Sequence, residues 1–138
     1  MTKEQILVAA NSVNKNTLME TLSIEFIDVG EDFLKAKMPI NKTVYQPDGV
    51  LHGGATAALA ESVGSAAVFI LNKDPNILVR GIEISCNHLK SAKSGFVYAI
   101  AKPIHNGRNI QLWEIRVTDD NDDLISLCKL TTFSRPIK

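Results

Sequence analysis

The chain has 138 residues, of which 45% are hydrophobic and 22% charged, and its fifteen basic and fifteen acidic residues balance to a net charge of zero. This length and composition are typical of one globular domain with its own core, so we expect a single domain over residues 1–138. The balanced charge excludes the strongly basic character of nucleic-acid binding proteins and of proteins that bind anionic membranes. We therefore expect neither nucleic acid nor membrane as a partner.

The predicted elements, in chain order, are a short helix, two strands, a long helix and four strands. Apolar residues recur with a helical period over residues 4–14, and from Leu22 the period falls toward two. Pro47 and Gly49 then mark a loop, and small residues from Gly53 to Leu71 predict a long helix that "NKDPN" ends. The predicted strands cover residues 22–30, 32–40, 79–90, 95–105, 109–120 and 124–134.

Alternation assigns faces to two of these strands. In the last strand but one, "NIQLWEIRVTDD", residues Gln111, Trp113, Ile115 and Val117 oppose the set Ile110, Leu112, Glu114 and Arg116. In "VRGIEISCNHLK", the side chains of Ile82, Ile84 and Cys86 are expected on one face, with His88 as a further candidate.

This order of elements predicts an α+β domain in which one antiparallel sheet carries a long helix across it, the arrangement called the hot-dog fold. The segment from His52 to Leu71 is long enough for a membrane span, but the central charge of Glu61 and the Gly, Ser and Thr content favour a core helix. Almost no face of this helix is polar, so we expect the sheet to wrap around it.

Cysteine usage and the first residues bear on location. Cys86 and Cys128 lie in apolar alternating runs, which favours small buried hydrophobic residues in a reducing compartment over a disulfide or a metal pair. Residues 1–16 carry no long apolar segment and no cleavage site. We therefore expect a cytoplasmic protein.

The start of the long helix is a candidate anion site. The first backbone N–H groups of a helix lack partners and carry the positive end of its dipole, and Gly53 presents no side chain to block approach. An oxygen that gains negative charge in a reaction could bind there. His52 and Gln46 flank this point and could contact the same substrate group. The alternative is structural: a tight turn at the glycine, with both side chains satisfying the loop backbone.

Glu61 is the only charged residue of the long helix. Eight residues separate it from Gly53, or roughly 12 Å along a helix axis, so one substrate carbonyl cannot touch both groups of the same helix. If they cooperate, a two-fold dimer must bring them together. Ser65, four residues on, shares the face of Glu61 and could hold a water. The alternatives are an ion pair with Arg80, Lys90 or Arg116, or an exposed helix edge.

The residue types point to acyl chemistry. A carboxylate that faces a polarised carbonyl can act as general base or nucleophile. The sequence has no G-x-S-x-G, no CxxC or HExxH, no dinucleotide or phosphate-loop glycine pattern, and no metal-ligand spacing among its three histidines. We therefore predict neither a metal nor a separate cofactor.

Residues 46–68, "QPDGVLHGGATAALAESVGSAAV", resemble the signature of hot-dog acyl-CoA thioesterases of the phenylacetate-pathway (PaaI) type. They are most similar to 1,4-dihydroxy-2-naphthoyl-CoA hydrolases and to the 4-hydroxybenzoyl-CoA thioesterases that carry a helix-borne glutamate, and the resemblance extends from about residue 20 onward. It implies that Glu61 is the general base or nucleophile and that the Gly53 N–H polarises the thioester. It also implies that Gln46 and His52 lie close to the thioester and that Ser65 helps to place water.

The same resemblance implies a homo-oligomer, in which two subunits pair into one sheet and dimers commonly pair into a tetramer. Coenzyme A, as part of the substrate, is expected along Gly81, along His88, Leu89, Lys90 and Ser91, and along His105, Asn106, Gly107, Arg108, Asn109 and Ile110. Asp48 departs from the apolar residue of many relatives, which weakens an aromatic preference if that position lines the acyl pocket.

Three functions stay open at this point. The first is an acyl-CoA thioesterase for an aromatic or medium-chain acyl group. The second is a hot-dog enoyl-thioester hydratase with His52 as base, and the third is a non-catalytic module that binds acyl-CoA. Phe26, Val50, Leu51, Val63 and Phe69 are candidates for the acyl pocket, although core packing explains each of them equally well.

Overall fold

The computed structural model describes residues 1–137 and has the predicted order of elements. The helices are α1 (Lys3–Ser12), α2 (Leu18–Thr21) and α3 (Gly53–Leu71), with a short 3-10 helix η1 (Lys42–Val44), and the strands are β1 (Glu25–Val29), β2 (Leu34–Pro39), β3 (Ile77–His88), β4 (Phe96–Asn106), β5 (Ile110–Thr118) and β6 (Leu124–Pro136). The bounds of α3 are those predicted from the sequence. The two shortest helices, α2 and η1, were not predicted.

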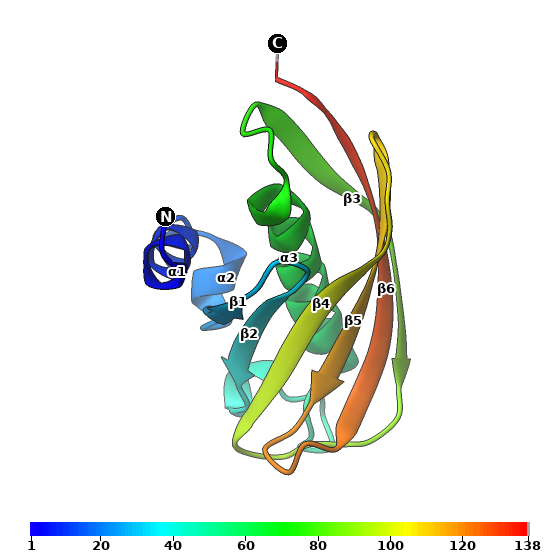
Figure 1. Ribbon diagram of the computed structural model, residues 1–138. Coiled ribbons are helices and arrows are strands. Elements are labelled where there is room, and N and C mark those ends of the chain that lie inside the picture. Colours follow the sequence, from blue (N-terminus) through cyan, green and yellow to red (C-terminus); the bar gives the residue numbers. More distant parts are fainter. Residues whose placement is uncertain (138) are drawn as a thin grey trace.

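The six strands form one antiparallel sheet in the order β1-β2-β4-β5-β6-β3, so β1 and β3 are its edges. Helix α3 crosses the sheet, and it lies between the sheet on one side and α1 and α2 on the other (Figure 1). This is the hot-dog arrangement expected from the sequence.

Side-chain alternation and small helical residues build the core between α3 and the sheet. Gln111, Trp113, Ile115 and Val117 of β5 are buried, as their alternation predicts. A Cβ atom added to Gly64 of α3 would lie 2.6 Å from Leu130 Cδ2, so the absence of a side chain lets α3 approach β6 closely.

The expected wrapping of α3 is wrong for one of its faces. Residues such as Leu59, Val63 and Ala67 are buried, but Glu61 and Ser65 are only half-buried and Phe69 is 48% exposed. The reason is that a single sheet covers one side of a helix, and α1 and α2 cover only part of the other. By length and composition α3 could cross a membrane, yet its packing is that of a core helix.

The predicted face of β3 is also wrong at one residue. The pairing of β3 with β6 shifts register between Gly81 and Glu83, and Ile82, in between, is 58% exposed. A bulge adds one residue to the strand, so Ile82 leaves the face shared by the half-buried Ile84 and Cys86. Further along, Cys86 lies directly opposite Cys128 of β6, and both are free thiols.

Candidate active site

His52 ends the loop before α3 and is the N-cap of that helix. Its Nδ1 accepts a hydrogen bond of 2.7 Å from the Gly54 N–H. Because Nδ1 is the acceptor, the neutral imidazole carries its proton on Nε2, which is therefore a hydrogen-bond donor. The ring is exposed, so this donor is available to a ligand at the helix start.

The loop that leads to His52 is fixed by its own backbone. The Gln46 N–H donates to the Val50 carbonyl over 2.8 Å, and the His52 N–H donates to Val44 over 2.8 Å. Gly49, at φ +81°, supplies the left-handed conformation that this turn requires. The side chain of Gln46 donates from Nε2 to Asp48 Oδ1 over 2.9 Å. The Asp48 carboxylate therefore orients the side-chain amide of Gln46.

Gly53 lies against the ring of His88, which comes from the end of β3. A Cβ atom added to Gly53 would lie 2.8 Å from His88 Nε2, so only glycine fits here without a shift of the ring. Ser126 donates its hydroxyl proton to the Asn87 carbonyl over 3.1 Å and lies 3.0 Å from His88 Nδ1. His88 Nδ1–H must then donate to Ser126, which leaves Nε2 as an acceptor beside Gly53.

Several predicted site residues share one cavity at this end of α3, which we call the glycine pocket. Its volume is about 280 Å³. The predicted residues that line it are Gln46, Gly53, His88, Leu89, Lys90 and Ser91. Val50 and Leu51 line it too, whereas the other pocket candidates Phe26 and Val63 are buried core residues.

Glu61 and Ser65 line a different cavity of about 550 Å³, which we call the glutamate pocket; Phe69 and Arg80 also line it. Gly81 of β3 allows the carboxylate to approach the strand, because a Cβ atom there would lie 2.5 Å from Glu61 Oε2. Within residues 1–137, Glu61 takes part in no ion pair: Arg80 donates to the Val79 carbonyl instead. Among the described residues, Glu61 therefore does not form the structural ion pair that the sequence left open.

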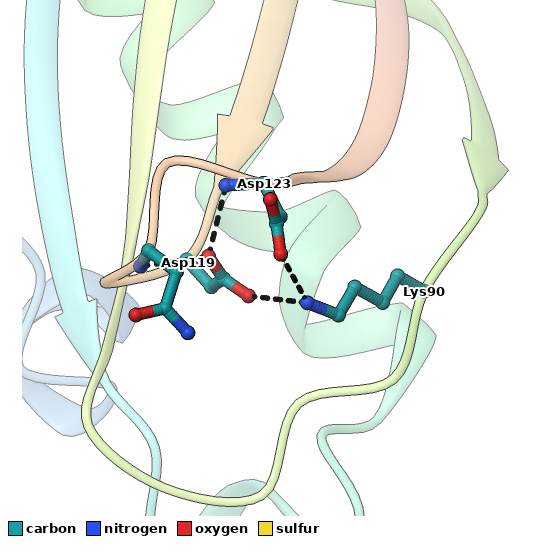
Figure 2. A network of polar contacts seen from close by, with 4 residues as sticks. Lys90, Asp119 and Asp123 are labelled. Carbon is teal, nitrogen blue, oxygen red and sulfur yellow. Dashed lines mark hydrogen bonds and ion pairs between the residues drawn. The ribbon is translucent and has the colours of Figure 1, made fainter.

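Lys90, the predicted phosphate ligand, is held by two carboxylates (Figure 2). Its Nζ lies 2.6 Å from Asp123 Oδ2 and 3.1 Å from Asp119 Oδ2. These hydrogen bonds, that of Asp123 foremost, raise the pKa of Lys90. From the sequence, the "DDNDD" turn was interpreted only as a solvated loop. Lys90 and Asp119 are 29 residues apart, so no local pattern predicted their contact.

The remaining predicted coenzyme A residues lie at the opposite end of the sheet. The β4–β5 hairpin contains His105, Asn106, Gly107, Arg108, Asn109 and Ile110. Gln111 pairs with Thr132, and Thr132 pairs with Gly81, so the hairpin neighbours the glutamate pocket rather than the glycine pocket. In Figure 1 this hairpin and the end of β3 lie at opposite ends of the molecule.

Sequence reasoning missed the residue that fixes this hairpin. Gln111, 1% exposed, donates from Nε2 to the Gly107 carbonyl over 2.9 Å and to Ser134 Oγ over 2.8 Å. Its Oε1 accepts from Thr132 Oγ1 over 2.6 Å. The available signal was an amide at a buried position of an otherwise apolar strand face.

Within a single chain, the two pockets have no lining residue in common. Both pockets lie between α3 and β3, at different positions along them: Gly53 contacts His88 at one pocket, and Glu61 contacts Gly81 at the other. Helix α3 and strand β3 therefore run in opposite directions past one another. As for metals, no group of three His, Cys, Asp or Glu side chains in residues 1–137 is placed to hold an ion.

Comparison with known proteins identifies the class. The family model of the thioesterase superfamily matches residues 48–126. The chain is 43% identical over 129 residues to a Pasteurella multocida protein named as an esterase, with 94% of this chain and 92% of the other covered. It is 39% identical over 126 residues to the 1,4-dihydroxy-2-naphthoyl-CoA hydrolase of Escherichia coli strain K12, with 91% and 92% covered.

A solved structure gives the same answer. The fold matches that of a thioesterase from Haemophilus influenzae with a TM-score of 0.91 and 38% identity, over 95% of this chain and 91% of the other. The chain therefore belongs to the thioesterase superfamily, and its α+β architecture is the hot-dog fold. It is a thioester hydrolase.

Proposed function

We propose that the protein hydrolyses an acyl-CoA thioester to a free acid and coenzyme A, in a site shared by two copies of the chain. One observation carries this proposal: Glu61 and Gly53 line separate pockets, roughly 12 Å apart along the axis of a single helix. Each pocket holds half of the groups that acyl transfer needs. The acyl-CoA class is supported by the family and by the name of the E. coli relative.

The edge strand β3 explains how two copies can combine these halves. An edge strand presents unpaired backbone groups, and a two-fold axis would pair β3 with β3 of a second copy in antiparallel fashion. Glu61 lies by Gly81, and Gly53 lies by His88, seven residues further along β3. Antiparallel pairing centred between these positions directs Glu61 of one subunit toward Gly53 of the partner subunit, twice per dimer.

The chemistry then follows from the groups that meet. The partner's Gly53 N–H and the partner's His52 Nε2–H would donate to the thioester oxygen as it gains negative charge. Glu61 would take a proton from the attacking water, held with help from Ser65, or would attack the carbonyl carbon itself to give a mixed anhydride, which water then hydrolyses to the free acid and Glu61. The C–O bond forms, the C–S bond breaks, and the sulfur of coenzyme A leaves with the proton that water supplied.

Coenzyme A would run along the surface near both ends of β3. In a dimer, the His88–Ser91 segment of the subunit that supplies Gly53 would lie beside the hairpin of the subunit that supplies Glu61. A phosphate that binds Lys90 must compete with Asp119 and Asp123. We further propose a single domain, a cytoplasmic location and a dimer that can pair into a tetramer, all of which suit an acyl-CoA enzyme with free thiols.

The hydratase alternative is less well supported. In the neutral imidazole of His52, Nδ1 is occupied by the Gly54 N–H and Nε2 already carries a proton. Such a ring donates a hydrogen bond but has no vacant nitrogen to act as a base. Hydration also releases no thiol, so one assay separates the two reactions.

The test is thiol release from acyl-CoA thioesters by the purified chain and by Glu61→Gln. We expect the variant to lose about 10²–10⁴-fold in kcat, because the group that moves the proton is gone. Glu31→Gln, exposed in the turn between β1 and β2, outside both pockets and away from β3, is the control and should keep full activity. Full activity in Glu61→Gln would remove that carboxylate from the mechanism.

A further inference from the structure

We infer that the acyl group of the substrate occupies a second cavity beside the glutamate pocket, and that the substrates are acyl-CoAs with an unsubstituted aliphatic chain. This inference rests on the function proposed above. The cavity lies between α1, α2 and the second half of α3, and its volume is about 700 Å³. Apolar residues of several elements line it, among them Ile6, Ala10, Val13, Met19, Phe26 and Ile70. We call it the α1 cavity.

The α1 cavity adjoins the proposed reaction centre. Met19, Ala66 and Phe69 line both this cavity and the glutamate pocket. Phe69 follows Glu61 by eight residues on α3, or about 12 Å along the axis. An acyl chain whose carbonyl carbon lies at Glu61 can therefore extend along α3, past Phe69, and into the space under α1.

The polarity of the α1 cavity decides the kind of acyl group. Its lining within residues 1–137 includes no Asp, Glu, Lys or Arg. Asn72 Oδ1 accepts from the Asp74 N–H over 2.8 Å, and Asn14 Nδ2 donates to the Ile24 carbonyl over 3.3 Å. The Oδ1 of Asn14 is buried and has no hydrogen-bond partner among the described residues. Most of the lining is nevertheless apolar, so a hydroxylated aromatic ring would set its hydroxyl groups against apolar side chains, whereas methylene groups need no hydrogen-bond partner.

Chain length then becomes the measurable consequence. Each methylene that moves from water into an apolar cavity should raise kcat/KM about fourfold, until the cavity is full. Acetyl-CoA cannot reach past Phe69. An extended octanoyl chain, about 9 Å from carbonyl carbon to terminal methyl, is still shorter than the separation of about 12 Å between Glu61 and Phe69, whereas a dodecanoyl chain, about 14 Å, is longer. We therefore expect kcat/KM to rise steeply from acetyl to dodecanoyl, and to be lower for 2,4-dihydroxybenzoyl-CoA than for dodecanoyl-CoA.

Matched variants of α1 locate the chain. Ala9 is exposed and lines the α1 cavity, and its neighbour Val8 is 70% exposed and lies outside it. Ala9→Phe should narrow the cavity and lower kcat/KM for dodecanoyl-CoA at least tenfold while acetyl-CoA hydrolysis is unchanged. Val8→Phe should change neither. Val13→Phe, at a second exposed lining position, should repeat the effect of Ala9→Phe, and melting curves confirm that each variant is folded.

The outcomes separate this inference from the proposed function. Equal kcat/KM for acetyl-CoA and dodecanoyl-CoA, or an equal loss of both in Ala9→Phe and in Val13→Phe, would overturn the inference and leave the thioesterase proposal standing. Faster hydrolysis of 2,4-dihydroxybenzoyl-CoA than of dodecanoyl-CoA would also overturn it. If no acyl-CoA in the series releases thiol, the proposed function itself fails.

Discussion

At the scale of single residues, His52 has two duties that use different atoms of one ring. Nδ1 accepts the Gly54 N–H and caps α3, while Nε2–H remains a donor on an exposed ring. A cap contributes to stability in the absence of substrate, whereas a donor to the thioester oxygen acts only in the reaction. Substitutions can therefore separate the two duties.

We predict that His52→Ala lowers the free energy of unfolding by about 1 kcal/mol, because the N-cap is lost. His52→Asn should keep most of that stability, since asparagine is among the best N-cap residues. Both variants lose the Nε2–H donor, so both should lose kcat/KM to a similar extent. Urea unfolding and thiol release measure the two effects. Full activity in His52→Asn would show that the ring serves the helix alone.

The thiol of Cys86 gives a prediction about pH. Burial, together with the hydrogen bond to Cys128, raises the pKa of Cys86 from 9.0 to about 12. A raised pKa means that the folded chain holds the proton more tightly, so its contribution to stability is present below pH 9 and is lost as the pH rises toward 12. Urea unfolding between these limits should show a smaller decline for Cys86→Ala than for the natural chain. Equal declines would contradict this account of the thiol.

Sequence alone could name the candidate site residues but not the residues that support them. Glu61, Gly53 and His52 lie within ten positions of one another, so their spacing is visible in the sequence. Ser126 stands 38 residues from His88, the ring that it orients. Only the pairing of β3 with β6 brings these two together, and no local pattern encodes a contact at that separation.

At the scale of elements, periodicity predicted what is long and regular. Helix α1 and the six strands show a period, and α3 is an unbroken run of 19 mostly small, apolar residues, whereas α2 covers four residues, about one helical turn, and leaves no periodic signal. The bulge at Ile82 was not predicted, because nothing in "RGIEIS" indicates the position of an extra residue. One extra residue in a strand reverses the faces that alternation assigns to the residues around it. The site depends on that bulge region, because Gly81 beside it is where Glu61 contacts β3.

The β4–β5 hairpin is an element whose shape depends on one buried amide. Gln111→Leu removes the bonds to Gly107, Ser134 and Thr132, so buried polar atoms lose their partner and the free energy of unfolding should fall by about 1–3 kcal/mol. If the hairpin binds the nucleotide part of coenzyme A, as proposed above, the KM for an acyl-CoA should rise with little change in kcat. The N-acetylcysteamine thioester of the same acid, which lacks that part, should show an unchanged KM. A rise for both substrates would mean that Gln111 supports the whole fold and not the hairpin's contact with coenzyme A.

At the scale of the whole molecule, the proposed reaction centre is divided between two cavities of the chain. Gly53 lines the glycine pocket and Glu61 the glutamate pocket, and α3 keeps them apart by its length. The exposed face of α3 and the edge strand β3 adjoin both pockets. The surfaces available for pairing with a second subunit are therefore next to Gly53 and Glu61. The sequence predicted this separation because an α-helix has a fixed rise per residue.

Subunit mixing tests that arrangement directly. Glu61→Ala leaves both sites of a homodimer without the acid, and Gly53→Ala places a methyl group 2.8 Å from His88 Nε2, at the point where the thioester oxygen must approach. Each variant alone should be nearly inactive. In a heterodimer of the two, one site combines Glu61 from one chain with Gly53 of the partner subunit and is intact, while the other site carries both lesions.

Random exchange makes half of the dimers heterodimers, so the mixture should recover about a quarter of natural activity. Mixing each variant with itself is the control and should recover nothing. Recovery should appear only after partial unfolding and refolding together, or on a timescale that matches subunit exchange, because folded homodimers cannot share a site. A mixture that exchanges subunits by mass measurement, yet stays inactive, would place the acid and the helix start in one chain's site and refute the shared centre.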